Sequence, residues 1–253
     1  MEKVKIQLVR VGHMPAGLNW KRITKWKSEL FSIDYSDKYD VRLDRNADIE
    51  NYIYSDRRLR GIIVEPLSAC FTLAVVGVPI QNEYFSRLLG QKRGVLTFFE
   101  TKEFLVAENI PLENFILRAL YTYTLIFLAN NRVMPEREPR SFFHDETRGC
   151  LFDMNVIKSE IVESCSRPII CDECKGRLAD GNFDGRSRYT PIANDLINTI
   201  ESEIRKIRKP LYYRVIDFAK IHPIMSLAIS GLTAVFLGIV SSLLASFIFD
   251  AIK

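Results

Sequence analysis

The chain has 253 residues, 47% of them hydrophobic, and a formal net charge of +4. This length provides material for one large hydrophobic core or for a domain with an appended segment. The net charge is too small over this length to indicate nucleic-acid binding, so we expect no nucleic-acid partner.

Most of the chain has the pattern of a mixed α/β domain. Apolar alternation or short β-rich apolar runs predict strands at residues 3–11, 39–43, 61–64, 71–78 and 94–100. Asn19 can cap a helix that carries Trp20, Ile23, Leu30 and Phe31. A further short helix is predicted around residues 49–54.

Two longer helices complete the predicted domain and its connector. Residues 112–128 are apolar nearly all round and are expected to lie at the centre of the core, and 130–142 to form an exposed loop. The second helix begins at Thr190 and is interrupted by Pro210. Its helical stripe consists of Ile192, Leu196, Ile197, Ile200, Ile204 and Ile207. We therefore expect a domain over residues 1–188 and a basic helical connector over 189–222.

Cysteines and a histidine gather in one region. The motif CDEC sets Cys171 and Cys174 one helical turn apart, and His144 and Cys150 offer a second pair upstream. Four such ligands can close a tetrahedral shell around Zn²⁺, as in structural zinc sites. We expect this module at residues 144–178; CDEC could instead bind no metal or act as a redox dithiol. The five cysteines lack the regular spacing of a disulfide framework, which favours a reducing compartment.

The C-terminus carries a long apolar segment. Residues 224–249 are 26 consecutive residues without a charge. A helix of this length reaches about 39 Å and can cross a hydrocarbon core of about 30 Å. A buried core helix is the alternative, but such helices rarely run this long without a polar face. We expect a transmembrane helix over 223–249, with only the short tail 250–253 behind it, and hence a tail-anchored protein.

Basic residues precede this segment. They are Arg205, Lys206, Arg208, Lys209, Arg214 and Lys220, with Asp217 the only acid among them. The positive-inside rule then places the N-terminal domain in the cytoplasm, and the same basic residues can contact anionic membrane lipid. A single-pass protein of a prokaryotic inner membrane fits this arrangement.

Small side chains recur at every fourth position of the apolar segment. They are Ser226, Ser230, Ala234, Gly238, Ser242 and Ser246. Small residues at this spacing let two helix backbones approach closely in lipid, which predicts a homo-oligomer through this helix. Chance recurrence of common membrane residues, or hydroxyl rows that line a narrow pore, are the alternatives.

The order of these elements and the His/Cys module resemble archaemetzincin, a zinc metalloprotease-like family. That family's pattern is HExxHxxGxxHC, then x4-C, a following Met and a distant CxxC. Here His144 precedes Cys150 at the family's distance, Met154 follows, and CDEC completes the module. The resemblance covers residues 3–178, with motif support only over 144–178. It implies an α+β metzincin-like mixed sheet with a long central helix and a structural zinc.

The catalytic half of the family's motif is missing. A catalytic zinc needs three protein ligands, an open position for water and a general base. The expected metal helix has no His, Glu, Asp or Cys between Asn114 and Asn130. Counting back from His144 at the family's spacing instead reaches Met134, Pro135 and Glu138. The resemblance therefore implies a pseudoprotease rather than an enzyme.

Two further departures follow from the resemblance. The first cysteine of the family's module is Asp145 here, so His144 is expected as the fourth zinc ligand, with Asp145 or Cys165 as alternatives. Tyr121, Tyr123 and Phe127 occupy the helix that holds the family's metal. We expect them to fill the vacated cleft; a ligand or peptide pocket built there is the other interpretation.

Three functions from different classes fit the sequence. The first is a non-catalytic, tail-anchored membrane sensor or scaffold that recognises an unknown ligand or protein partner. Its sharper version is an oligomeric membrane effector, for example in bacterial antiviral defence. The second is a membrane-anchored zinc metalloprotease with atypical ligands, and the third is a CxxC redox switch.

Overall fold

The computed structural model describes residues 2–35, 47–183 and 189–252 and divides the chain into two compact units, Met1–Lys209 and Pro210–Lys253. The first unit is the expected mixed α/β domain. The second holds the apolar C-terminal helix.

A five-stranded sheet of order β2-β1-β3-β5-β4 organises the first unit. Neighbouring strands are parallel except β4, which runs antiparallel to β5 at one edge. The strands are β1 (Val4–Val11), β2 (Phe31–Asp34), β3 (Phe71–Val76), β4 (Ser86–Gly90) and β5 (Arg93–Thr97). All six residues of β3 are buried, as expected for a central strand that is covered on both faces.

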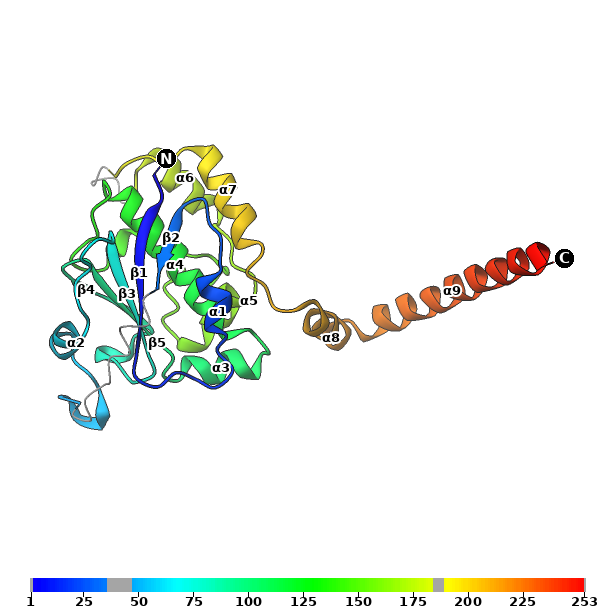
Figure 1. The fold of residues 1–253 in the computed structure, drawn as a ribbon, viewed down its shortest axis with the longest axis horizontal. Coiled ribbons are helices and arrows are strands. Elements are labelled where there is room, and N and C mark those ends of the chain that lie inside the picture. Colours follow the sequence, from blue (N-terminus) through cyan, green and yellow to red (C-terminus); the bar gives the residue numbers. More distant parts are fainter. Residues whose placement is uncertain (1, 36–46, 184–188, 253) are drawn as a thin grey trace. The chain divides into compact units, whose positions relative to one another are not determined.

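Helices cover the two faces of the sheet unequally (Figure 1). The larger core lies between the sheet and α4 (Leu112–Ala129), all of whose residues are buried. The smaller core joins the other face to α2 (Asp56–Ile62) through apolar side chains such as Leu59, Ala74 and Val76. The remaining helices of this unit are α1 (Trp20–Thr24), α3 (Thr101–Ala107), α5 (Ile161–Ser166), α6 (Asp172–Asp180) and α7 (Asn194–Ile204).

The N-terminal elements differ in part from the sequence prediction. Asn19 does cap α1 through its side chain, but the helix has only five residues and Phe31 begins β2. The strand expected at 39–43 lies outside the described residues. The run 61–64 is not a strand, because α2 begins at Asp56 with Ser55 as its cap. A four-residue apolar run can belong to a strand or to a helix. In this segment Ser55, which can cap a helix, is the residue that indicates the helix.

The C-terminal end of the domain also differs from the expected boundary at residue 188. The stripe residues Ile197, Ile200 and Ile204 of α7 are buried in the main core, so the compact unit continues to Lys209. A hydrogen-bond network fixes α7 there: the Glu203 carboxylate accepts from Tyr121 at 2.6 Å and from Ser28 Oγ at 2.7 Å. The first part of the predicted connector is therefore a core helix.

The second unit consists of α8 (Leu211–Ile221) and α9 (Pro223–Ile252). Residues Pro223–Ala245 of α9 have a mean hydropathy of 2.2 and are long and apolar enough to cross a membrane. Helix α4 is also long and apolar enough to cross a membrane, but it is fully buried in the domain core. Helix α4 has a mean hydropathy of 1.2 and is covered by the domain, whereas the more apolar α9 is not covered by the chain.

Candidate metal centre and surface pocket

His144, Cys150, Cys171 and Cys174 converge at one buried point. Their ligand atoms all lie within 4.8 Å of one another. Cys171 is the N-cap residue of α6 and Cys174 lies in its first turn, so the helix start sets the spacing of this pair. His144 and Cys150 come from the preceding loop, which forms bridges from His144 to Asp153 and from Cys150 to Ile169. The sequence predicted this grouping.

Backbone hydrogen bonds hold Cys150 beside the CDEC helix. Ile169 donates to the Gly149 carbonyl at 3.0 Å and accepts from Leu151 at 2.9 Å. Gly149 has a φ of +75°, which glycine adopts without the steric cost of a side chain. The Asp153 carboxylate accepts from the backbone N–H groups of Arg148 and Cys150, at 3.0 and 2.9 Å. The turn that presents Cys150 is therefore fully determined by its neighbours.

The His144 ring is oriented as a metal ligand requires. Its Nδ1 lies 2.9 Å from the Glu146 carbonyl oxygen and 3.6 Å from Asp153 Oδ1, so Nδ1 carries the proton. The lone pair of Nε2 then faces Cys171 Sγ, 3.6 Å away. Metal-ligating histidines are usually fixed in this way, by donating the second ring N–H to a carbonyl or carboxylate.

Hydrogen-bond donors surround the sulfur atoms. The Cys171 and Phe152 amides donate to Cys150 Sγ at 3.4 and 3.5 Å, and Arg148 lies 3.7 Å from Cys171 Sγ. A hydrogen bond from Cys174 lowers the pKa of Cys150, while the same bond and burial raise the pKa of Cys174. The sulfur atoms thus lie among groups that can stabilise negative charge.

The donor set fits a structural zinc ion. A tetrahedral site with Zn–S and Zn–N bonds of about 2.3 and 2.0 Å has edges of about 3.5–3.8 Å. The Cys171–His144 separation of 3.6 Å matches such an edge. Three sulfurs and one imidazole nitrogen are ligands that favour Zn²⁺ over harder cations. All four side chains are buried and converge on one point, so they would fill the tetrahedral shell of a bound ion.

The two alternative ligands lie elsewhere. Asp145 is exposed, although it directly follows His144. Cys165 is buried in α5, outside the cluster, where burial raises the pKa of its thiol to about 12 and its carbonyl accepts from Asn114. The structure thus brings His144, and neither of these residues, to the three sulfurs.

The aromatic residues of α4 are core residues. Tyr121 and Tyr123 are buried, and Phe127 packs against Phe71 with ring centroids 5.8 Å apart. Tyr121 also accepts a hydrogen bond from Trp26 at 3.0 Å. These side chains lie in the interior of the domain, as predicted for a central core helix; that they fill a vacated metal cleft stays a prediction.

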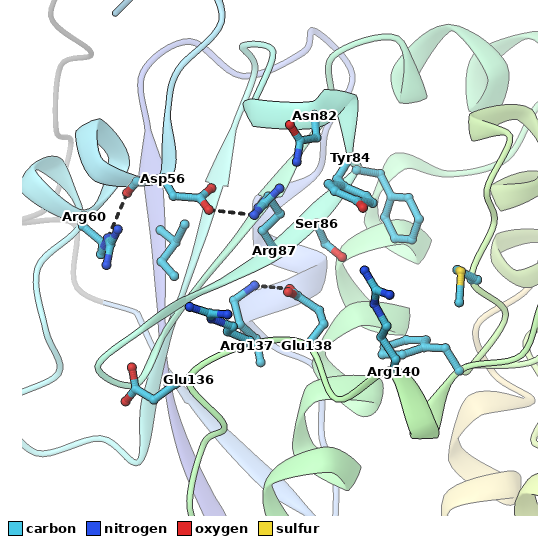
Figure 2. Close-up of a pocket in the computed structure, with 15 residues that line it drawn as sticks. Asp56, Arg60, Asn82, Tyr84, Ser86, Arg87, Glu136, Arg137, Glu138 and Arg140 are labelled. Carbon is cyan, nitrogen blue, oxygen red and sulfur yellow. Dashed lines mark hydrogen bonds and ion pairs between the residues drawn. The ribbon is translucent and has the colours of Figure 1, made fainter. Parts of the chain in front are cut away.

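A pocket of about 700 Å³ opens beside the edge strand β4. Figure 2 shows it between α2, β4 and the loop that contains Arg137, Glu138 and Arg140. Arg87 pairs with Asp56 at 2.7 Å, and Glu138 accepts from the Leu88 amide at the open edge of β4. Burial raises the pKa of Glu138. Phe85, Phe143 and Met154 supply apolar lining.

Sequence reasoning missed this pocket. Neither β4 nor the role of the EREPR loop as a pocket wall was predicted. The sequence feature that could have indicated this wall is a pair of prolines, Pro135 and Pro139, with alternating charges between them. Prolines favour an extended segment, whose side chains can line a neighbouring pocket.

The residues expected at the membrane surface do not share one environment. Arg205, Lys206, Arg214 and Lys220 are exposed and Arg208 is half-buried. The prediction is wrong for Lys209, whose side chain is only 4% exposed and lies 3.9 Å from Glu108. It packs on the domain because the compact unit continues to this residue.

The predicted helix-association ridge lies on α9. Its members Ser230, Ala234, Gly238 and Ser242 are exposed and Ser226 is half-buried, while the side chain of Ser246 lies outside the described residues. A Cβ at Gly238 would meet no atom within 4 Å, so the chain itself leaves this position open.

Comparisons with protein-family models, with curated proteins and with solved structures gave no match for this chain.

Proposed function

We propose that the chain is a non-catalytic membrane sensor or scaffold that is anchored by α9. In this proposal the α/β domain is stabilised by one structural zinc, and α9 holds it on a membrane. The observation that carries the proposal is the closed cluster of His144, Cys150, Cys171 and Cys174. When bound there, zinc would cross-link the 144–153 loop to α6, with every ligand position taken by protein.

The resemblance to a degenerate metzincin-like domain is part of this proposal. Its support is the order of elements: the β1–α1–β2 unit, the inner strands, the buried helix α4 and then the His/Cys module. In this proposal the buried residues Tyr121, Tyr123 and Phe127 of α4 take the place of the family's catalytic metal. A role in binding rather than hydrolysis follows from this substitution.

The pocket beside β4 is the proposed recognition site. Its volume of about 700 Å³ is within the range of small-molecule sites, and it combines aromatic walls with charged groups of both signs. In the sharper version of the proposal the protein is an oligomeric effector, as in bacterial antiviral defence. Its copies then associate through the ridge of small residues on α9. A cytoplasmic domain at a prokaryotic inner membrane remains the proposed location.

Zinc content of the detergent-extracted full-length chain tests the proposal. We expect one zinc per chain in the wild type, and loss of both zinc and folded domain after Cys171→Ser. The matched control is Cys165→Ser, which removes a buried thiol outside the cluster and should keep the zinc. Two zincs, one of which survives Cys171→Ser, would contradict the proposal and favour the metalloprotease alternative. A zinc-free wild type with a Cys171–Cys174 disulfide would favour the redox switch.

A further inference from the structure

Helix α8 exposes a large apolar surface for so short an element. Leu211, Tyr212 and Ile221 are 69–70% exposed, and Val215 is 58% exposed. None of its residues is buried. An apolar surface of this kind in a soluble helix marks a contact with a partner or a membrane.

The apolar and polar residues of α8 lie on different sides. At about 100° per residue, Leu211, Val215 and Phe218 share one face, which Tyr212 widens. Asp217 and Lys220 fall on the opposite side together with Tyr213, and Arg214 and Ile221 lie between the two faces. The helix is therefore amphipathic, with Lys220 on its polar side and Arg214 at the edge of that side.

The position of α8 in the chain decides what covers its apolar face. Only His222 separates α8 from Pro223, the first residue of α9. If α9 crosses a bilayer, the 11 residues of α8 lie within about 17 Å of the point where the chain enters it. This inference therefore rests on the membrane anchor of the proposed function.

The composition of α8 matches that location. Tyrosines such as Tyr212 and Tyr213 have apolar rings and polar hydroxyls that suit the level of lipid headgroups. Arg214 and Lys220 can reach lipid phosphates from the polar side, because long basic side chains extend toward the headgroups. Pro210 and Pro223 bound the helix at both ends, so it forms an element distinct from α7 and α9.

We infer that α8 is an in-plane anchor: it lies along the phospholipid surface, with Leu211, Tyr212, Val215 and Phe218 inserted at the boundary of the acyl chains. The anchor then has two parts, a span and an interfacial helix. Only Pro210 separates Lys209, the last residue of the α/β domain, from the first residue of this helix along the chain.

Photo-crosslinking in lipid nanodiscs tests this inference with the full-length chain. Benzoylphenylalanine replaces Val215 on the apolar face or Asp217 on the polar face, in nanodiscs of phosphatidylcholine and phosphatidylglycerol. We expect at least about fivefold more phospholipid adduct from position 215 than from position 217. Equal lipid adducts at both positions, or adducts from 215 to the α/β domain or to a second copy of the chain, would overturn it.

Replacement of Ile239 in the span by the same photo-crosslinker separates the two proposals. Lipid adducts from 239 without a preference for 215 would overturn the interfacial helix alone. Absence of lipid adducts from 239 would overturn the membrane anchor itself, and the interfacial helix with it.

Discussion

The side chains around the metal centre show how single residues divide the work. His144 offers a nitrogen that could bind a metal ion, while Asp153 accepts from backbone amides and holds the turn that presents Cys150. Arg148 lies beside Cys171 and also pairs with Glu173 at 2.8 Å. The ligands alone were visible in the sequence, because their residue types and spacing are characteristic. The supporting residues were not, since carboxylates and arginines occur everywhere in the chain.

His144 and Asp145 are adjacent in sequence but only His144 faces the sulfurs. We expect His144→Ala to weaken zinc binding by more than about 100-fold, beyond what loss of an outer-shell contact costs. Asp145→Ala should leave the affinity unchanged because this residue is exposed. Competition with a chromogenic chelator measures the zinc affinity of both variants. An equal loss in the two would mean that the aspartate takes part in the site.

Glu138 predicts a pH dependence of stability. Its pKa is raised above the ordinary value of 4.5 by burial, so the folded state favours the protonated form. The stability that this group contributes is present below about pH 4.5 and is lost as the pH rises through the higher folded-state pKa. Glu138→Gln keeps an oxygen for the Leu88 amide and removes the charge.

We therefore expect Glu138→Gln to raise the melting temperature at pH 8 and to change it little at pH 4.5. The exposed Glu136, which accepts from the Gln91 amide at 3.2 Å, provides the control Glu136→Gln. Differential scanning calorimetry measures the melting temperature of both variants at the two pH values. The same change in melting temperature at both pH values for Glu138→Gln would contradict the expected linkage.

Individual elements followed their sequence signals to different degrees. The alternating strand β1, the buried strand β3 and the apolar helix α4 were predicted, because each carries a long and consistent pattern. Strand β4 was missed because SRLLG is short and lies at the sheet edge. Helix α7 was predicted as a helix but not as part of the core, since its stripe does not identify the surface that covers it.

The contact of α7 with the core depends on the Glu203 network. Tyr121→Phe removes the hydroxyl that links Glu203 to Trp26, and leaves the buried Glu203 and the half-buried Trp26 with one partner fewer. We expect a loss of about 1–3 kcal/mol in the free energy of unfolding. Tyr52→Phe, at a side chain that is 81% exposed, is the control and should be neutral. Urea unfolding followed by tryptophan fluorescence measures both, and equal stabilities would exclude an energetic role of the network.

Helix α9 contains a matched pair of glycines for testing association. Gly238 belongs to the predicted ridge, whereas Gly231 lies one residue beyond Ser230 and outside it. Neither would bring a new Cβ within 4 Å of another atom in the chain. We expect Gly238→Ile to weaken self-association and Gly231→Ile to leave it unchanged, because bulk at an interface keeps the backbones apart. Sedimentation in detergent and crosslinking in membranes measure this; an unchanged oligomer in Gly238→Ile would remove the ridge as an interface.

The whole molecule combines a mixed α/β domain with a separate apolar unit. Basic residues lie on the N-terminal side of α9. We expect the domain to face the cytoplasm of the host cell. Proteinase K should therefore digest it in inside-out vesicles and spare it in right-side-out vesicles. The opposite pattern would reverse the predicted topology.

The sequence by itself determined the local features of this protein. Ligand types at fixed spacing indicated the His/Cys cluster, and 26 uncharged residues indicated a helix that can cross a membrane. These signals are local because each depends on residues close together along the chain or on a continuous run. Only the tertiary structure decided which residues surround them. It placed His144 rather than Asp145 at the sulfurs, α7 and Lys209 in the domain, and a pocket beside β4. These outcomes depend on long-range packing, and packing is a property of neighbouring elements that no single segment encodes.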